Sequence, residues 1–291
     1  MKIVITGANG QLGHILADYF KNHEVVALTR RELDLTTEDL PLKLQSHGPD
    51  WVINTAAYTA VDRAESEPQE ANHINHICVA NLASACKSMN ARLLHVSTDF
   101  VFDGKGITPY TVDAACTPLN TYGKSKHEGE QAVLRIHPDG SCIVRTAWLY
   151  SARGNNFVRT MLHLMQERDE LGVVVDQVGT PTSTATLALF IRKLVEQNET
   201  GVFHWTDAGT ASWYDFAVAI NEEAVAAGIL YKNISINPIS TTEFPTAAKR
   251  PHYSVLDKSK SYARTLSRPV HWRTALREVI DKISKMENNI V

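Results

Sequence analysis

Short apolar runs alternate with amphipathic stretches along the first half of the chain. The apolar runs contain many β-branched residues and span 2–6, 24–28, 51–54, 92–96 and 141–145. Stretches with helical spacing of apolar residues lie between them, for example at 11–22, 71–88 and 122–135. Buried strands that alternate with helices form a parallel sheet with helices on both faces. The pattern therefore predicts an α/β fold with a doubly wound parallel sheet.

The alternation weakens after residue 150, where aromatic residues, prolines and loops become more frequent. We therefore expect one domain over residues 1–150 and a smaller C-terminal α/β domain over 151–291. The apolar run 202–205 is predicted to return to the main sheet, so that a segment near 183–205 rejoins the first domain.

A glycine-rich turn links the first predicted strand to the first predicted helix. Gly7, Gly10 and Gly13 have the spacing that permits a tight turn, close approach of a diphosphate and close helix packing. A diphosphate in this turn would lie at the helix N-terminus, where free amides favour an anion. A turn without a ligand is the alternative, but the order of strand, glycines and helix favours an NAD(P)-binding Rossmann domain. Its predicted cofactor contacts here are Gly7, Asn9, Gly10, Gln11 and Leu12.

Tyr122 and Lys126 stand one helical turn apart, and Thr98 lies at the end of a predicted strand. Because positions i and i+4 share a helix face, we expect the Lys126 ammonium to lower the pKa of Tyr122 and to reach a nicotinamide ribose. A phenol tuned in this way can donate a proton to a carbonyl group. A solvated helix face is the alternative for the Tyr-x-x-x-Lys pattern alone.

The end of the second predicted strand bears on the choice of cofactor. Thr29 stands where an acidic residue would bind the ribose of NAD, and Arg30 and Arg31 follow it. Because a guanidinium binds a 2′-phosphate well, we expect NADPH, with NADH possible. In the alternative interpretation both arginines only solvate a loop.

Composition excludes some partners. The 29 basic and 32 acidic residues give a net charge of −3 without a basic block, which argues against nucleic acid. No apolar stretch reaches membrane-spanning length, and the first residues predict a strand rather than a signal peptide. The four cysteines lack C-x-x-C spacing, and His73 and His76 lack further ligands. We expect a cytoplasmic protein without a metal.

The glycine turn, the Ser-Thr segment and Tyr-x-x-x-Lys resemble the extended short-chain dehydrogenase/reductase superfamily. Within it, the chain from Ile3 to about Trp272 is similar to the dTDP-4-dehydrorhamnose reductase family. Trp148-Leu-Tyr150 is one of the similar segments. The segments that discriminate better are Gly154-Asn-Asn-Phe-Val158, Asp176-Gln-Val-Gly-Thr-Pro-Thr182 and Lys249-Arg-Pro-His-Tyr-Ser254.

The resemblance implies NADPH-dependent reduction of the C4 ketone of a dTDP-sugar. It implies Tyr122 as proton donor, Thr98 as a hydrogen-bond donor to the ketone oxygen and Lys126 as a ribose contact. Further implied cofactor contacts are Arg30, Asp34, Leu35, Ala56, Ala57 and Tyr58. The implied substrate contacts are Thr98, Asp99, Trp148, Asn155, Asn156 and Arg250.

Alternatives remain for several of these residues and for the function. Trp148 could pack in the core, Asn155 and Asn156 could form a turn, and Arg250 could be a surface cation. Some members of the resembled family dimerise around Mg²⁺ through a glutamate, but Ile15 occupies that position here, so we expect a monomer or weak homodimer. Two alternative functions remain. The chain could be a regulatory subunit like the β subunit of methionine adenosyltransferase, or a related nucleotide-sugar reductase or epimerase.

Overall fold

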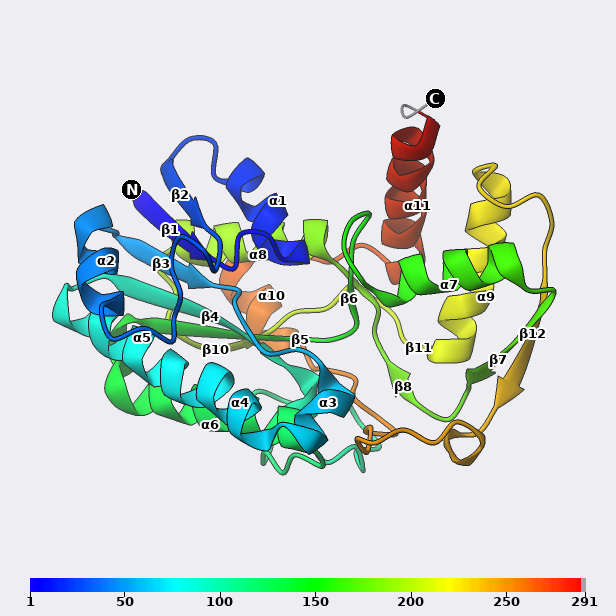
Figure 1. The fold of residues 1–291 in the computed structure, drawn as a ribbon, viewed down its shortest axis with the longest axis horizontal. Coiled ribbons are helices and arrows are strands. Elements are labelled where there is room, and N and C mark those ends of the chain that lie inside the picture. The colour runs from blue at the N-terminus through cyan, green and yellow to red at the C-terminus, as the bar shows by residue number, and fades with distance from the viewer. Residues whose placement is uncertain (289–291) are drawn as a thin grey trace.

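A six-stranded parallel sheet forms the centre of the structure, a computed structural model that describes residues 1–288. Its strand order is β10-β5-β4-β3-β1-β2, which confirms the predicted doubly wound α/β fold (Figure 1). The strands are β1 (Lys2–Thr6), β2 (Glu24–Leu28), β3 (Trp51–Asn54), β4 (Arg92–Thr98), β5 (Ser141–Thr146) and β10 (Gly201–His204).

Helices cover both faces of this sheet because its strands are apolar on both sides. Ile3 and Ile5 of β1 pack toward α1 (Gln11–Tyr19) and α8 (Thr184–Glu196). Val4, between them, points to the other face. That face is covered by α2 (Leu40–His47), α5 (Cys78–Ser88) and α6 (Thr121–Ile136).

One predicted helix is interrupted. The stretch 71–88 was expected to be a single helix, but it contains the end of α4 (Pro68–Asn72), a π-helical turn η1 (His73–Ile77) and α5. The Asn75 side chain in this turn accepts from the backbone N–H of Tyr58 and donates to the backbone C=O of Tyr58. Its amide also donates to the Ser125 hydroxyl of α6. A wider turn that brings a polar side chain to several partners is a common use of π-helical geometry. The short helix α3 (Val61–Ser66) precedes α4.

Most of the remaining elements form a second unit beside the sheet (Figure 1). Its apolar core lies between helices α7 (Phe157–Glu167), α9 (Trp213–Ala226) and α11 (Trp272–Asn288) and a parallel pair of strands, β7 (Glu170–Val174) and β12 (Ser235–Ile239). Two short pairs lie between the units: β6 (Leu149–Tyr150) with β9 (Thr182–Ser183), and β8 (Val178–Gly179) with β11 (Ala211–Ser212). The remaining helical segments are η2 (Asp99–Val101), η3 (Pro138–Gly140), η4 (Thr241–Glu243) and α10 (Ser259–Thr265). Within residues 1–288, no helix combines the length and apolarity needed to cross a membrane.

Candidate active site

The glycine turn between β1 and α1 is packed too tightly for side chains. Gly7 has a φ of +72°, and a Cβ atom there would lie 2.8 Å from the nitrogen of Ala56. A Cβ atom on Gly13 would lie 2.3 Å from the carbonyl oxygen of Gly7. The turn thus keeps its backbone open at the N-terminus of α1, where free N–H groups suit a diphosphate.

This turn forms one end of a cavity of about 910 Å³ at the carboxyl ends of the parallel strands. Cavities of this size hold cofactors and substrates in enzymes of this architecture. Both units of the chain contribute to its wall. The predicted residues that line it are Gly7, Asn9, Gly10, Gln11, Leu12, Arg30, Asp34, Leu35, Ala56, Ala57, Thr98, Asp99, Tyr122, Lys126, Trp148, Asn155 and Arg250.

Tyr58 and Asn156 are the two predicted site residues that do not line the cavity. The Tyr58 hydroxyl donates to Glu67 at 2.6 Å, away from the cavity. The Asn156 side chain caps α7 by accepting from Arg159 N–H, and its amide donates to Gln11 Oε1 at 2.9 Å. The amide of Asn156 therefore fixes a cavity residue, Gln11, rather than facing the cavity itself.

The adenosine end of the predicted cofactor site contains an ion pair. Arg30 Nε lies 3.3 Å from Asp34 Oδ2, and the Arg30 side chain is 67% exposed. A backbone hydrogen bond from Thr36 is the main cause that lowers the pKa of Asp34. Arg31 lines a second hollow next to the main cavity, together with Asn9 and Arg30. Both guanidinium groups are thus accessible at the edge of the site.

Three side chains meet at the predicted reaction centre. Thr98 ends β4, while Tyr122 and Lys126 lie one turn apart on α6, whose first turn is capped by Asn120. Lys126 is only 2% exposed, and its Nζ donates to the carbonyl oxygen of Val96 at 2.8 Å. Burial lowers the pKa of Lys126 to about 8.

The expectation that Lys126 lowers the pKa of Tyr122 is wrong. Burial raises the pKa of Tyr122 to about 12, the Asp99 charge adds to this effect, and the Thr98 hydroxyl opposes it only in part. The loss of hydration decides the direction of this shift, and the Lys126 Nζ bonds the Val96 carbonyl oxygen. Tyr122 consequently keeps its proton at neutral pH.

Asp99 is a buried acid in the cavity wall. Its Oδ1 accepts from Thr98 Oγ1 at 3.1 Å, whereas its Oδ2 is buried and has no hydrogen-bond partner within residues 1–288. Burial raises the pKa of Asp99 to about 6, against the opposing effect of nearby Ser254 and Thr98 hydroxyls. The Thr146 hydroxyl, opposite Thr98 on β5, is also buried and unpaired among the described residues. Buried polar groups without a hydrogen-bond partner in a cavity wall indicate a place where polar atoms of a ligand bind.

Trp148 is stacked against Trp213, which the sequence analysis missed. The two ring centroids lie 3.5 Å apart with planes 5° from parallel, and both indoles line the cavity. Trp148 has a φ of +46°, which is rare for a non-glycine residue. Gly179 makes room for it, since a Cβ atom there would lie 2.6 Å from the indole. The Trp213 indole donates to Gln177, so the segment 176–182 positions both rings.

Arg250 is held by an aspartate that the sequence analysis did not single out. Its Nη2 lies 2.6 Å from Asp62 Oδ2, and its Nη1 lies 3.1 Å from Asp62 Oδ1. The hydrogen bonds from Arg250 are the main cause that lowers the pKa of Asp62. The pair ties the C-terminal segment to α3 at the edge of the cavity. Nothing in the local sequence around either residue indicates this contact across 188 positions.

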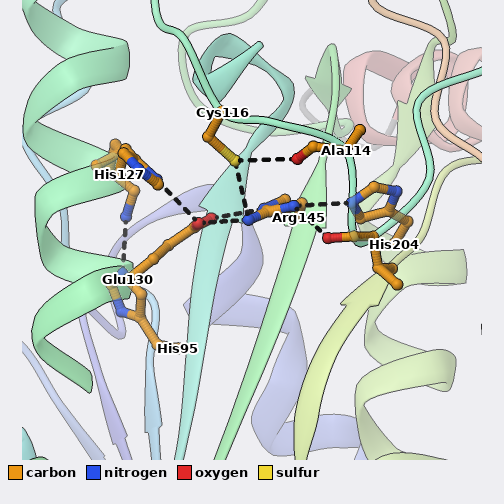
Figure 2. A network of polar contacts seen from close by, with 9 residues as sticks. His95, Ala114, Cys116, His127, Glu130, Arg145 and His204 are labelled. Atoms are coloured by element: carbon orange, nitrogen blue, oxygen red, sulfur yellow. Dashed lines mark hydrogen bonds and ion pairs between the residues drawn. The ribbon is translucent and has the colours of Figure 1, made fainter. Parts of the chain in front are cut away.

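A buried network behind the reaction centre joins α6 to β5 (Figure 2). Arg145 donates to both oxygens of Glu130, at 2.9 and 2.8 Å, and to Cys116 Sγ at 3.3 Å. Burial raises the pKa of Glu130, but the nearby His127 ring, 3.6 Å away, and the hydrogen bonds from Arg145 outweigh it and hold this pKa at about 2. Cys116, His127 and Glu130 could form a metal-ligand group by spacing alone. Arg145 already supplies the positive charge there.

A parallel sheet with a glycine turn, a Thr-Tyr-Lys group in the adjoining cavity and a second unit that completes its wall define an extended short-chain dehydrogenase/reductase. This class comprises dinucleotide-dependent oxidoreductases and their relatives. A family model described as the RmlD substrate binding domain matches residues 1–285, and the chain belongs to this family.

Similar proteins extend over almost the whole chain. A dTDP-4-dehydrorhamnose reductase of Aggregatibacter actinomycetemcomitans is 43% identical over 96% of this chain and 98% of its own. The crystal structure of a dTDP-4-dehydrorhamnose reductase from Clostridium acetobutylicum is 44% identical, with a TM-score of 0.91 over 97% of this chain and 99% of that chain. One from Bacillus anthracis, in complex with NADP, is 37% identical with a TM-score of 0.91 over the same shares.

Proposed function

We propose that this chain is an NADPH-dependent dTDP-4-dehydrorhamnose reductase, which reduces the C4 ketone of dTDP-4-dehydro-L-rhamnose to dTDP-L-rhamnose. The observation that carries the proposal is the single cavity in which the glycine turn, the Thr98, Tyr122 and Lys126 side chains and the Trp148 ring meet. The reductases similar to this chain over nearly its whole length support the same activity.

The open glycine turn and the unpaired Thr146 hydroxyl fit a dinucleotide at this end of the cavity. We assign the diphosphate to the turn from Gly7 to Leu12 and the adenosine to Asp34 and Leu35, with Ala56 and Ala57 along the backbone. Arg30 is accessible to a 2′-phosphate and Thr29 carries no charge, which supports NADPH over NADH. The relative with bound NADP agrees with this choice.

NADPH, when bound, supplies the hydride for the ketone carbon. Tyr122 holds its proton at neutral pH and donates it to the ketone oxygen as negative charge develops there. The Thr98 hydroxyl, which now donates to Asp99, turns to the same oxygen and stabilises that charge. Lys126 orients the cofactor ribose from the next turn of α6.

The groups for the sugar nucleotide lie at the other end of the cavity. We assign the deoxysugar to the Trp148 ring, a sugar hydroxyl to the unpaired Oδ2 of Asp99 and the diphosphate to Arg250. Asn155 lines the cavity beside the glycine turn, where its carbonyl oxygen accepts from Gln11, whereas Asn156 and Tyr58 support neighbouring residues. In this scheme residues 1–150, rejoined by a segment near 183–205, form the cofactor-binding domain and the rest of 151–291 forms the substrate-binding domain, while Thr98, Asp99 and Trp148 of the first domain also contact the substrate.

We further propose a monomer or weak homodimer, because the packed side chain at Ile15 offers no ligand for a metal between subunits. The cysteines Cys78, Cys86, Cys116 and Cys142 are free thiols, which suits the reducing cytoplasm.

The direct test is to follow NADPH oxidation with the purified protein and dTDP-4-dehydro-L-rhamnose, and to identify the product by NMR. We expect stoichiometric NADPH consumption and dTDP-L-rhamnose. Binding of NADPH without consumption would instead indicate a regulatory subunit. Product formation without net oxidation, with tightly held NAD⁺, would indicate an epimerase. The coupling constants of H4 in the product report the stereochemistry delivered at C4.

A further inference from the structure

His95 lies behind the catalytic lysine and has no role in the reaction described above. It is fully buried in the middle of β4, and its ring stands between Asn54 of β3 and Lys126 of α6. Its Nδ1 lies 3.0 Å from Asn54 Nδ2, and its Nε2 lies 3.2 Å from Lys126 Nζ. The ring thus contacts a fixed amide on one side and the catalytic amine on the other.

Asn54 can take only one orientation. Its Oδ1 accepts from the backbone N–H of Ala56 at 3.1 Å and from the Thr6 hydroxyl at 2.7 Å. A backbone N–H can only donate, so the atom that it contacts must be the amide oxygen. The NH₂ group of Asn54 therefore faces His95 Nδ1 and donates to it.

This contact determines where His95 carries its proton. Burial lowers the pKa of His95 well below its ordinary value, so the ring is neutral. A neutral imidazole whose Nδ1 accepts a hydrogen bond has its proton on Nε2. His95 consequently presents an N–H donor to the Lys126 nitrogen.

A donor at this position distinguishes the two forms of Lys126. An amine has a lone pair that accepts from Nε2–H while it donates to Val96, 2.8 Å away. An ammonium group has no lone pair, so its hydrogens would oppose the Nε2–H. Burial, which lowers the pKa of Lys126 to about 8, acts in the same direction.

No other charged group around Lys126 in the described part of the chain adds to the lowering of its pKa. Glu130, one turn further along α6, raises the pKa of Lys126, but its carboxylate is paired with Arg145 of β5. Tyr122 on α6 keeps its proton, and Asp99 follows the end of β4 and acts on Tyr122. Within residues 1–288, the Lys126 Nζ forms its hydrogen bonds with the Val96 carbonyl oxygen and with the His95 ring.

We propose that His95 is a positioning residue for the reduction: fixed by Asn54 with its proton on Nε2, it holds the Lys126 amine in place and opposes its protonation. His95 thereby sets the pH at which Lys126 becomes the cation that orients the ribose. This role rests on the proposed function of Lys126. Through Thr6 and Ala56, the same Asn54 also ties this arrangement to the strand ends that carry the cofactor loops.

The proton position is measurable without any assay of activity. We expect the ¹⁵N NMR spectrum of the wild-type imidazole nitrogens to show His95 protonated at Nε2, unprotonated at Nδ1 and unchanged from about pH 6 to about pH 9. The chain has 12 histidines, and the signals absent from His95→Phe identify this one. A proton on Nδ1, or a charged ring in this range, would overturn the proposal even if the protein is an active reductase.

The kinetic test is the dependence of kcat/KM on pH. His95→Phe keeps a ring but removes the donor, so the basic limb of the profile should move up by about one pH unit. Asn54→Asp should move it in the same direction, because a carboxylate accepts from Nδ1–H and leaves the Nε2 lone pair to accept from an ammonium.

His137→Phe is the matched control, since the ring of this histidine bonds the carbonyl oxygen of Ala91 at the far end of α6. The basic limb of the His137→Phe profile should not move. Circular dichroism establishes that each variant is folded. An unmoved basic limb in folded His95→Phe would contradict the proposal. If His95→Phe does not fold, Asn54→Asp decides, since the histidine whose proton moves from Nε2 to Nδ1 in that variant identifies the His95 signals in the wild-type spectrum. A wild-type protein without activity would refute the proposed function, while the NMR result would still stand.

Discussion

At the residue scale, the buried Asp99 lowers the stability of the fold near neutral pH at the place where we propose that a sugar hydroxyl binds. A carboxyl group that is 1% exposed and has one unpaired oxygen is costly in the ionised form. Its pKa near 6 means that the folded protein holds a proton there more strongly than the unfolded chain does. The stability that Asp99 contributes is therefore complete below about pH 4 and is lost as the pH rises through 6.

Asp99→Asn should stabilise the protein near pH 7.5 but hardly near pH 4. The difference between the folded pKa of about 6 and the ordinary aspartate pKa of 3.8 corresponds to at most about 3 kcal/mol. Thermal unfolding of both proteins at several pH values measures it. An equal change in stability at pH 4 and pH 7.5 would contradict the raised pKa of Asp99. We also expect Asp99→Asn to lower the affinity for the dTDP-sugar.

Arg250→Ala should lose affinity for dTDP and for the dTDP-sugar while NADPH binding is retained. A guanidinium to phosphate pair in a partly closed cleft is worth roughly 1.5–3 kcal/mol, so the Kd for dTDP should rise by about one to two orders of magnitude. Calorimetric titration with NADPH present measures it. Asp62→Asn releases Arg250 from its carboxylate partner and should not weaken the binding of dTDP.

The matched control for Arg250→Ala is Arg63→Ala. This arginine lies on α3 beside Asp62, but it pairs with Glu67 and is 69% exposed. Its removal should leave the Kd for dTDP unchanged. Equal dissociation constants for wild type and Arg250→Ala would remove Arg250 from the diphosphate site.

At the scale of elements, α6 positions the proposed reaction centre by packing closely on neighbouring segments. Gly129 faces the π-helical turn η1, and a Cβ atom there would lie 2.1 Å from the carbonyl oxygen of Asn75. The ion pair between Glu130 and Arg145 fixes the same helix to β5. These contacts set where Tyr122 and Lys126 stand relative to Thr98.

Gly129→Ala should therefore lower the stability of the protein by about 1–3 kcal/mol and reduce turnover by displacing α6. Chemical denaturation and steady-state kinetics measure the two effects. Gln131→Ala, at an exposed position of the same helix, is the control and should change neither. A Gly129→Ala protein as stable as wild type would show that α6 can move away from η1 without cost.

The sequence was sufficient for α6 and for the glycine turn because both have local signals. Asn120 is a good N-cap, and Tyr122 and Lys126 follow at helical spacing. The π-helical turn could not be predicted, since it depends on Asn75 reaching Tyr58 and Ser125 across other elements. Hydrophobic periodicity alone indicates a continuous helix there.

At the scale of the whole molecule, the parallel sheet followed from apolar runs that are buried on both faces. Its six strands begin within a residue or so of the predicted runs. The stacking of Trp148 on Trp213 and the pairing of Arg250 with Asp62 did not follow. Such contacts join segments far apart in the sequence, and their partners carry no local pattern. The resemblance to known reductases supplied Trp148 and Arg250, but only the structure supplied what holds them.

The most direct test of the whole account is Tyr122→Phe, because it removes one hydroxyl from the centre of the cavity. We expect turnover with dTDP-4-dehydro-L-rhamnose to fall at least about a hundredfold, the scale of losing a positioned proton donor. The Kd for NADPH, measured by fluorescence titration, should stay within about twofold, since the packing of the ring on Phe100 is kept. A Phe variant that retains most of its turnover would contradict the assignment of Tyr122 as the proton donor in this cavity.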